Sequence, residues 1–152
     1  MKRNLLHLVA PGVLLTASVV NAHVVVTPFV VAKIEATFNS LFAASQTGDV
    51  QTIKRHLSDE EYALNKVLFE QNQDYPRFLQ SYYRGAKMRV GEIQSVLSAS
   101  DDVIAEFIVD FPGGETTITR MRLTGNQAGE WTIKKYLAGK FDNGEPAGKG
   151  RK

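Results

Sequence analysis

The side chains that could do chemistry in this sequence are hydroxyls and one amine rather than carboxylates. The residues predicted to line a pocket are Tyr62, Tyr82, Thr117, Thr119 and Lys135. Tyrosine and threonine hydroxyls can donate to a ligand oxygen, and a lysine beside a second titratable group can act in acid–base chemistry. Buried tyrosines more often serve as core residues whose hydroxyl reaches solvent, and this alternative holds for Tyr62, Tyr82 and Tyr83 alike. The set favours ligand binding, and no catalytic residue is predicted.

Histidine and cysteine chemistry is sparse. The chain has three histidines and no cysteine, and only His23 and His56 follow the first 22 residues. His56 has the chemistry of a general acid or base, but we favour a surface histidine near a helix C-terminus, stabilised by the helix dipole. Because no second histidine or acidic residue stands at metal-ligand spacing, the sequence predicts neither a metal nor a cofactor.

The strand candidates are assigned to a face by the alternation in residues 103–137. Three runs rich in β-branched and aromatic residues, 103–111, 115–123 and 130–137, are separated by glycine-containing turns, which predicts an antiparallel meander. Odd positions are mostly apolar, which places Thr117, Thr119 and Lys135 on the dry face and Glu106 and Asp110 on the wet one. The predicted pairs are Phe111–Glu115, Phe107–Thr119, Ala105–Met121, Glu106–Arg120, Ile108–Ile118, Leu123–Trp131 and Met121–Ile133.

The wet face also carries an apolar strip. By parity it consists of Ile104, Ile108, Ile118 and Tyr136. The sequence predicts that this strip covers a partner protein or a second copy of the chain, giving a homodimer through the outer sheet face.

Helices precede the strands. Thr27 and Pro28 begin a long helix with an apolar stripe at three- and four-residue spacing, and Gly48 ends it. Asp49 caps a short second helix. The Ser58–Glu61 capping box starts a third helix that extends to about Glu70.

The faces of the third and fourth helices are predicted from the same spacing. The third is expected to bury Tyr62, Phe69 and either Val67 or Leu68. The fourth begins at Asp74-Tyr75-Pro76 and directs Phe78, Leu79, Tyr82 and Tyr83 inward. A first strand from Lys87 to about Leu97 follows, with a bulge at Gly91.

The N-terminus predicts export. Lys2 and Arg3 precede the apolar run from Leu5 to Val20, and Val20-Asn21-Ala22 offers a small-residue cleavage site, so residues 1–22 are typical of a signal peptide. If residues 1–22 are cleaved, the mature protein is a periplasmic or secreted domain without a stable membrane span. Because residues 24–31 are apolar too, a retained membrane anchor is the alternative.

Charge gives no sign of a nucleic-acid partner. The net charge is +2, and removal of Lys2 and Arg3 leaves 16 basic and 16 acidic residues. A nucleic-acid-binding protein would carry a basic stripe. The domain is assigned to residues 23–137, and the Gly/Pro-rich basic tail, 138–152, is predicted to be disordered.

These elements resemble a known superfamily. The segment from Phe42 to Asp49 (FAASQTGD), the following His56-Leu57-Ser58 and the strand Gly129–Ile133 (GEWTI) are similar to the nuclear transport factor 2-like superfamily over about residues 30–137. The resemblance implies an α+β fold in which N-terminal helices pack in the concave face of a curved antiparallel sheet of about four strands. It also implies a cone-shaped interior in which enzymatic members place a base and tyrosine donors.

No carboxylate is predicted on the concave face, which departs from the enzymatic members. We therefore expect a non-enzymatic exported domain that binds a small apolar or amphipathic molecule or a protein partner. Two alternatives stay open: a pocket enzyme of the isomerase, dehydratase or hydrolase kind, using Lys135, His56 or a tyrosine, and a membrane-anchored assembly subunit of a secretion system.

Overall fold

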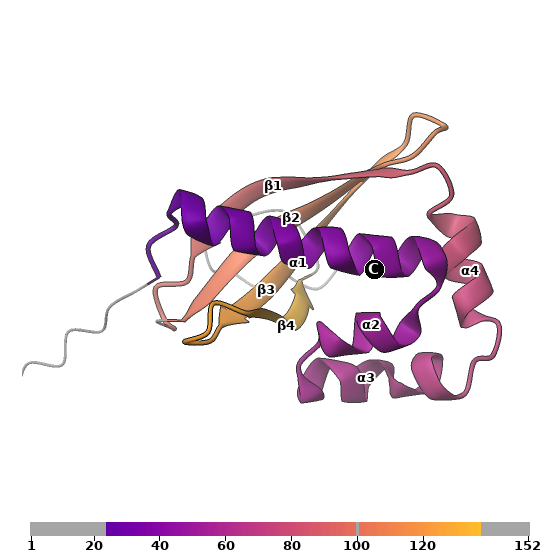
Figure 1. Ribbon diagram of the computed structural model, residues 1–152, viewed down its shortest axis with the longest axis horizontal. Coiled ribbons are helices and arrows are strands. Elements are labelled where there is room, and N and C mark those ends of the chain that lie inside the picture. The colour runs from indigo at the N-terminus through magenta and orange to yellow at the C-terminus, as the bar shows by residue number, and fades with distance from the viewer. Residues whose placement is uncertain (1–23, 100, 138–152) are drawn as a thin grey trace, which may run out of the picture.

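The computed structural model describes residues 24–99 and 101–137 (Figure 1). The predicted signal peptide, 1–22, and the predicted tail, 138–152, lie outside these residues. The elements are α1 (Pro28–Thr47), α2 (Val50–Arg55), α3 (Asp59–Glu70), α4 (Tyr75–Tyr82), β1 (Lys87–Ser95), β2 (Asp102–Asp110), β3 (Thr116–Gly125) and β4 (Trp131–Leu137). The predicted α+β class, with the helices before the strands, is confirmed.

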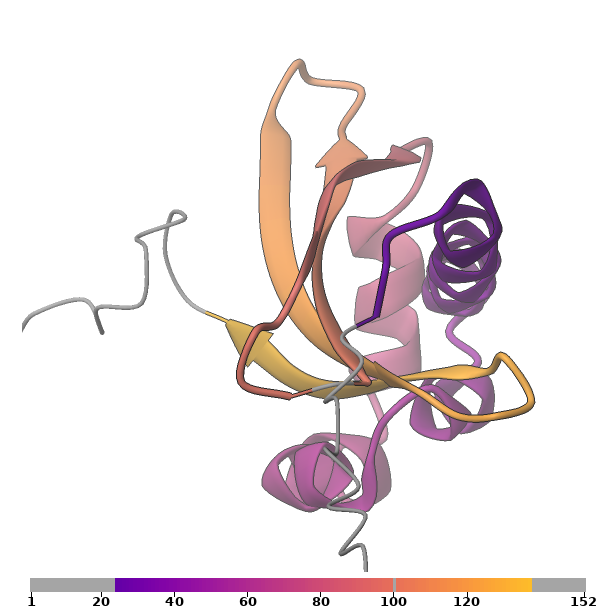
Figure 2. The same ribbon diagram turned by 90° about the vertical axis from the view of Figure 1, so that its left-hand side faces the viewer.

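The four strands form one antiparallel sheet in the order β1-β2-β3-β4. Figure 2 shows that the sheet is strongly curved and that α1 lies against its concave face. The core forms between these two layers, where the Phe38 and Phe107 rings meet edge to face with centroids 5.2 Å apart. Phe38 and Ile34 are fully buried. Burial of one such side chain contributes about 1.5–3 kcal/mol to folding, so this contact holds α1 on the sheet. We call the space between the helices and the concave face of the sheet the cone.

The C-terminal end of α1 is where α4 docks. Gly48 adopts a left-handed conformation (φ 69°), and a Cβ there would lie 2.6 Å from the Pro76 carbonyl oxygen. The Gln80 side chain donates to the Thr47 carbonyl oxygen at 2.7 Å, which satisfies one of the free carbonyls at the helix end. The chain therefore needs glycine at 48 both to end α1 and to let α4 approach.

The predicted register of β2 and β3 is confirmed. Ala105 faces Met121, Glu106 faces Arg120, Phe107 faces Thr119 and Ile108 faces Ile118. The predicted bulge at Gly91 is also present, as a register shift between Val90 and Ile93. A Cβ at Gly91 would lie 2.5 Å from a Glu106 carboxylate oxygen, so the bulge leaves no room for a side chain.

The predicted register of β3 and β4 is wrong. Trp131 faces Gly125 and Ile133 faces Leu123, two positions from the prediction, because the turn closes on Asn126 and Glu130. A second shift follows between Arg122 and Leu123, where Lys134 is the extra residue of β4. This bulge reverses the alternation. Tyr136 faces Met121 on the concave side, while Lys135 faces Arg122 on the outer side.

The outer face therefore differs from the predicted apolar strip. Ile104, Ile108 and Ile118 lie on it, but Tyr136 does not. Ile108 is buried and Ile118 is 58% exposed. Charges cover much of this face, with ion pairs from Arg122 and Lys134 to Asp102 and from Arg120 to Glu106.

The free edge of β4 is covered by residues 56–58. The Ser58 amide donates to the Ile133 carbonyl oxygen at 2.8 Å, and the Ile133 amide donates to the His56 carbonyl oxygen at 2.8 Å. The Ser58 hydroxyl accepts from the Glu61 amide at 3.2 Å, as a cap should. Because the Ser58 amide is already used, the predicted capping box is only half formed, and the Glu61 carboxylate turns to Asn65 instead.

The predicted inner faces of α3 and α4 are partly wrong. On α3, Tyr62 and Phe69 are half-buried, but Val67 and Leu68 are 62% and 41% exposed, and Glu61 is buried instead. On α4, Leu79 is buried, whereas Phe78 and Tyr82 are 55% and 45% exposed. Both helices pack against the rest of the molecule along narrower faces than the apolar spacing indicates.

Candidate functional site

A cavity of about 290 Å³ lies inside the cone. It is bounded by α1, α2, α3 and α4 on one side and by the concave face of β2, β3 and β4 on the other. Its lining residues are Leu41, Ser45, Ile53, Asn65, Phe69, Tyr75, Leu79, Tyr83, Phe107, Thr119, Met121 and Tyr136. The lining is mainly apolar with a few polar groups, which is the usual make-up of a small-molecule site.

Three tyrosine side chains line this cavity. Tyr75 begins α4, Tyr83 follows α4, and Tyr136 lies on β4. Burial raises the pKa of all three hydroxyls above the ordinary value of 10.0. The negative charge of Glu61 and the neighbouring Tyr75 and Tyr83 raise the pKa of Tyr136 further. At neutral pH the three hydroxyls are therefore uncharged donors and acceptors.

These hydroxyls are available to a ligand. Among residues 24–99 and 101–137, none of the three phenolic oxygens has a protein hydrogen-bond partner. Tyr136 is 37% exposed and lines the cavity, and Tyr75 and Tyr83 are half-buried, so water can reach these side chains. A bound molecule with an acceptor oxygen would take the place of water as the partner of these hydroxyls.

Asn65 is a polar residue of the cavity wall, and Glu61 holds its side chain in place. The Asn65 amide nitrogen donates to the Glu61 carbonyl oxygen at 2.9 Å and to its carboxylate at 3.0 Å. Both amide hydrogens are then used, which leaves the Asn65 side-chain oxygen as an acceptor for the cavity. Glu61 is 5% exposed and fixes the orientation of Asn65 from behind.

Of the five predicted pocket residues, Thr119 lines the cavity. Tyr62 stacks on Phe69 with centroids 5.7 Å apart, and its hydroxyl donates to the Glu70 carboxylate on the surface of α3. Thr117 faces Val109 farther along β3. None of Tyr62, Tyr82, Thr117 and Lys135 is among the cavity lining.

Tyr82 and Lys135 point away for different reasons. Tyr82 is on the outward side of α4 and meets the Tyr83 ring edge to face at 4.9 Å. Lys135 follows the bulge and is exposed on the outer face.

The sequence carried one signal for Tyr136. Two consecutive lysines, 134 and 135, interrupt an otherwise alternating strand, and strict alternation would bury one of them. A bulge lets both remain on the outer side, and Tyr136 then turns inward. Tyr75 had no such signal, because its position depends on how α4 docks on α1.

His56 lies outside the cone. Its Nε2 is 2.8 Å from the Ser40 hydroxyl oxygen, which links α2 to α1. Burial lowers the pKa of His56, so the ring is neutral at pH 7 and the dipole effect expected from the sequence is outweighed. The ring borders a shallow recess of about 390 Å³ that also contains Lys33 and Arg55.

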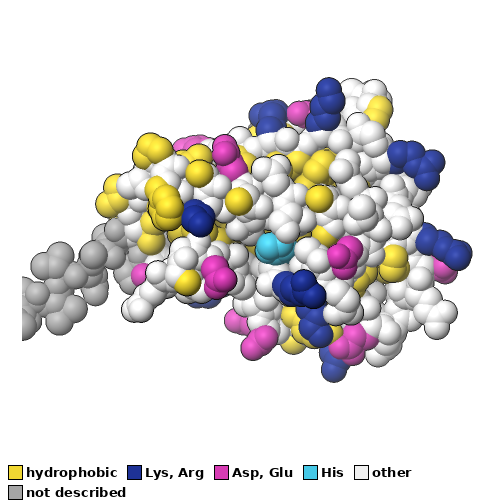
Figure 3. Space-filling model, viewed as in Figure 1, with side chains coloured by type: hydrophobic (Ala, Val, Ile, Leu, Met, Phe, Trp, Pro, Cys, Tyr) yellow, Lys and Arg dark blue, Asp and Glu magenta, His cyan; other side chains and the backbone are white. Residues whose placement is uncertain are grey.

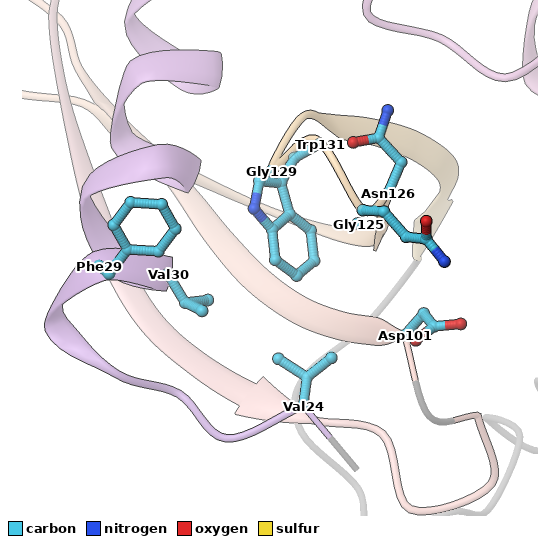
Figure 4. A pocket seen from close by; sticks show the side chains of 9 residues that line it. Val24, Phe29, Val30, Asp101, Gly125, Asn126, Gly129 and Trp131 are labelled. Carbon is cyan, nitrogen blue, oxygen red and sulfur yellow. The ribbon is translucent and has the colours of Figure 1, made fainter. Parts of the chain in front are cut away.

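A larger recess of about 580 Å³ opens at the other end of the sheet. Figure 4 shows Val24, Phe29 and Val30 at the start of α1 facing Trp131 and the β3–β4 turn. Its walls are mostly apolar, and Phe29 is 64% exposed there. We regard the smaller cavity as the candidate site because it lies between the helices and the concave face of the sheet and is lined by three tyrosines.

No arrangement for metal binding or membrane spanning occurs in the described part of the chain. No three acidic or histidine side chains there are grouped to hold a metal ion. None of the four helices has the length and apolar character needed to cross a bilayer.

The chain was compared with protein-family models, with curated proteins and with solved structures, and none of them matches. The resemblance to the nuclear transport factor 2-like superfamily therefore stays a prediction from the sequence, and the site has to be interpreted from its own geometry.

Proposed function

We propose that this protein binds a small, neutral, largely apolar molecule inside the cone. The observation that carries this proposal is that Tyr75, Tyr83 and Tyr136, whose hydroxyls have no protein partners among the described residues, line one mainly apolar cavity. The apolar walls take up the body of the molecule. The hydroxyls donate to a carbonyl or hydroxyl oxygen on it.

The charges around the cavity favour a neutral ligand. No lysine, arginine or histidine is among its lining residues, and the carboxylate of Glu61 accepts a hydrogen bond from Asn65, which does line the cavity. A carboxylate or phosphate ligand would lose its hydration without gaining a cation, which is strongly unfavourable. With the predicted N-terminal signal, the proposed role is that of an exported binding protein rather than an enzyme.

The test is binding of a matched ligand panel to hydroxyl-deletion variants. Native mass spectrometry of protein isolated from its host identifies any retained molecule, and titration with small cyclic ketones, phenols and the corresponding carboxylates ranks ligand classes. Tyr83→Phe and Tyr136→Phe should each weaken binding of a neutral ligand by about 2- to 10-fold, the equivalent of one hydrogen bond.

Tyr82→Phe is the control. Tyr82 is the sequence neighbour of Tyr83, but it does not line the cavity. Equal binding by the Tyr83→Phe/Tyr136→Phe double variant and the Tyr82→Phe control would refute the proposal. Preferential binding of the carboxylates would refute its charge argument.

One observation favours a second candidate, the pocket enzyme. Glu61 is a buried carboxylate next to the cavity residue Asn65, and its negative charge raises the pKa of Tyr136 in addition to the effect of burial. Turnover of a bound ketone, seen as deuterium exchange next to its carbonyl and lost in Glu61→Gln, would support this candidate. Binding without exchange would leave the binding protein as the function.

A further inference from the structure

Helix α4 lies at the end of the molecule where α1 stops (Figure 1), and its outward side presents aromatic side chains to solvent. Phe78 is 55% exposed and Tyr82 is 45% exposed. At 3.6 residues per turn, Arg77, Phe78, Ser81 and Tyr82 occupy one sector of this helix. The opposite sector holds the buried Leu79 and the side of Gln80 that bonds to α1. The exposed sector is therefore not needed to attach α4.

The rings in this sector stack on one another, so neighbouring rings cover part of their faces. Phe78 lies nearly parallel to Tyr75 on one side (17°, centroids 6.2 Å apart) and to Tyr82 on the other (22°, 5.5 Å). Phe111 closes the row with its centroid 5.1 Å from that of Tyr82. A surface that stacks nucleic-acid bases needs open ring faces. A row of rings already stacked on one another instead suits insertion among headgroups and acyl chains, where aromatic residues gather in membrane proteins.

Basic residues predominate in the chain between Asp74 and Glu92, and no acid occurs between these two. Between Tyr75 and Val90 the chain has Arg77, Arg84, Lys87 and Arg89 and no aspartate or glutamate. Arg89 pairs with Asp110 at 3.1 Å. Within the described residues, Arg77, Arg84 and Lys87 take part in no ion pair. On the face shown in Figure 3, basic and acidic side chains are interspersed, and this includes the end of the molecule where α4 lies.

We propose that this α4 patch, made of Arg77, Phe78, Tyr82, Arg84 and Lys87, is a contact surface for an anionic lipid bilayer. The aromatic rings enter the headgroup region, and the three free cations meet lipid phosphates. Each cation near an anionic bilayer strengthens binding by about 5-fold at physiological salt. Contact of this kind is peripheral and salt-sensitive. It does not depend on the cavity, because none of the five patch residues lines it.

A site-specific probe tests the contact in the full-length chain. The chain has no cysteine, so Ser81→Cys labelled with an environment-sensitive fluorophore reports on the centre of the patch alone. Gln51→Cys, on the exposed side of α2, carries the same label away from the patch. With vesicles of phosphatidylcholine and phosphatidylglycerol (7:3), the label at 81 should shift to shorter wavelength and the label at 51 should not. Pure phosphatidylcholine should give a much smaller shift at 81.

Matched variants separate the patch from the rest of the surface. Phe78→Ser/Tyr82→Ser should abolish the shift at 81. Arg77→Gln/Arg84→Gln should raise the lipid concentration for half-maximal shift by about 20-fold, which is the effect expected for the loss of two cations. The controls are Phe29→Ser, an exposed ring at the other end of α1, and Arg55→Gln/Lys66→Gln, which removes the same charge elsewhere.

Three results would overturn the proposal: equal shifts at positions 81 and 51, equal effects of the patch and control variants, or a shift at 81 with a single-stranded oligonucleotide but not with anionic vesicles. The last result would assign the patch to a different class of partner.

Discussion

At the scale of single residues, Asp102 shows how a charge is held on the outer face. It accepts from Arg122 Nε at 2.6 Å and lies 3.3 Å from Lys134 Nζ, and its side chain is 3% exposed. Its cover consists of the long side chains of Arg122 and Lys134, so it is enclosed but close to the surface. Burial alone would raise its pKa. Hydrogen bonds from Thr124 and Arg122 and the two positive charges outweigh burial and hold the pKa below its usual 3.8.

The pKa of Asp102 predicts an acid-sensitive contribution to stability. Because the folded-state pKa is below that of the unfolded chain, the contribution is complete above about pH 4 and is lost as the pH falls through the folded value. Asp102→Asn should lower the free energy of unfolding by about 2 kcal/mol at pH 7, with a smaller difference from wild type at pH 3. Urea denaturation at the two pH values measures both.

Asp110→Asn is the control, since Asp110 forms an exposed pair with Arg89 and should affect stability little. A difference between wild type and Asp102→Asn that stays the same at pH 3 would mean that the ionised carboxylate contributes nothing.

Residue patterns of this kind explain which parts of the site were predictable. Alternation placed Thr119 and Met121 on the concave face correctly, because β2 and β3 pair without interruption. It failed for Lys135 and Tyr136, because one bulge reverses the parity of everything that follows. The concave face therefore has a tyrosine where the sequence indicated a lysine, and this changes the expected ligand from one that pairs with a cation to a neutral one.

At the scale of elements, the docking of α4 on the end of α1 positions Tyr75 and Tyr83. Local signals predicted where both helices begin and where α1 ends, from Pro28, Gly48 and Pro76. They did not predict which face of α4 is inward. That face is set by Gly48, Gln80 and Leu79, which come together only once the chain has folded. The aromatic spacing of α4 indicated a core stripe, whereas its rings extend from the core to the surface.

Substitution of Gly48 tests this junction. Gly48→Ala should lower the free energy of unfolding by about 2–4 kcal/mol, because the left-handed backbone is unfavourable for alanine and its Cβ would meet the Pro76 carbonyl at 2.6 Å. Gly114→Ala is the matched comparison. Gly114 has a φ of 86°, and no atom lies within 4 Å of the position that a Cβ would take. Its replacement by alanine should therefore lower the free energy of unfolding by only about 1 kcal/mol.

Chemical denaturation gives the free energy of unfolding of both variants. The difference between their two losses is the part due to the close approach of α4 to residue 48. Equal losses would show that backbone conformation alone requires glycine at 48 and that α4 can move away freely.

At the scale of the whole molecule, the two walls of the cavity are held with different strength. The concave wall belongs to a sheet with a continuous apolar core against α1. The α3 side is attached through Tyr62, Asn65 and Phe69 and through the backbone bonds of residues 56–58 to β4, while Leu64 and Val67 are 74% and 62% exposed. Loosely attached elements open locally at a lower free energy than the core. The cone can therefore admit a molecule by movement of α3 without unfolding of the sheet.

This difference predicts the pattern of amide hydrogen exchange. Amides of α3 should exchange through openings at least about 2 kcal/mol below those of β2 and β3, because so little apolar surface is exposed when α3 separates. The Ile133 amide, which bonds to the His56 carbonyl oxygen at the edge between α3 and the sheet, should be intermediate. A neutral ligand bound in the cone contacts α3, α4 and β4 together, so it should raise protection of all three and leave the start of α1 unchanged. Uniform protection of α3 and the sheet without ligand would instead mean that the molecule opens as a single unit, and access to the cavity would then require global unfolding.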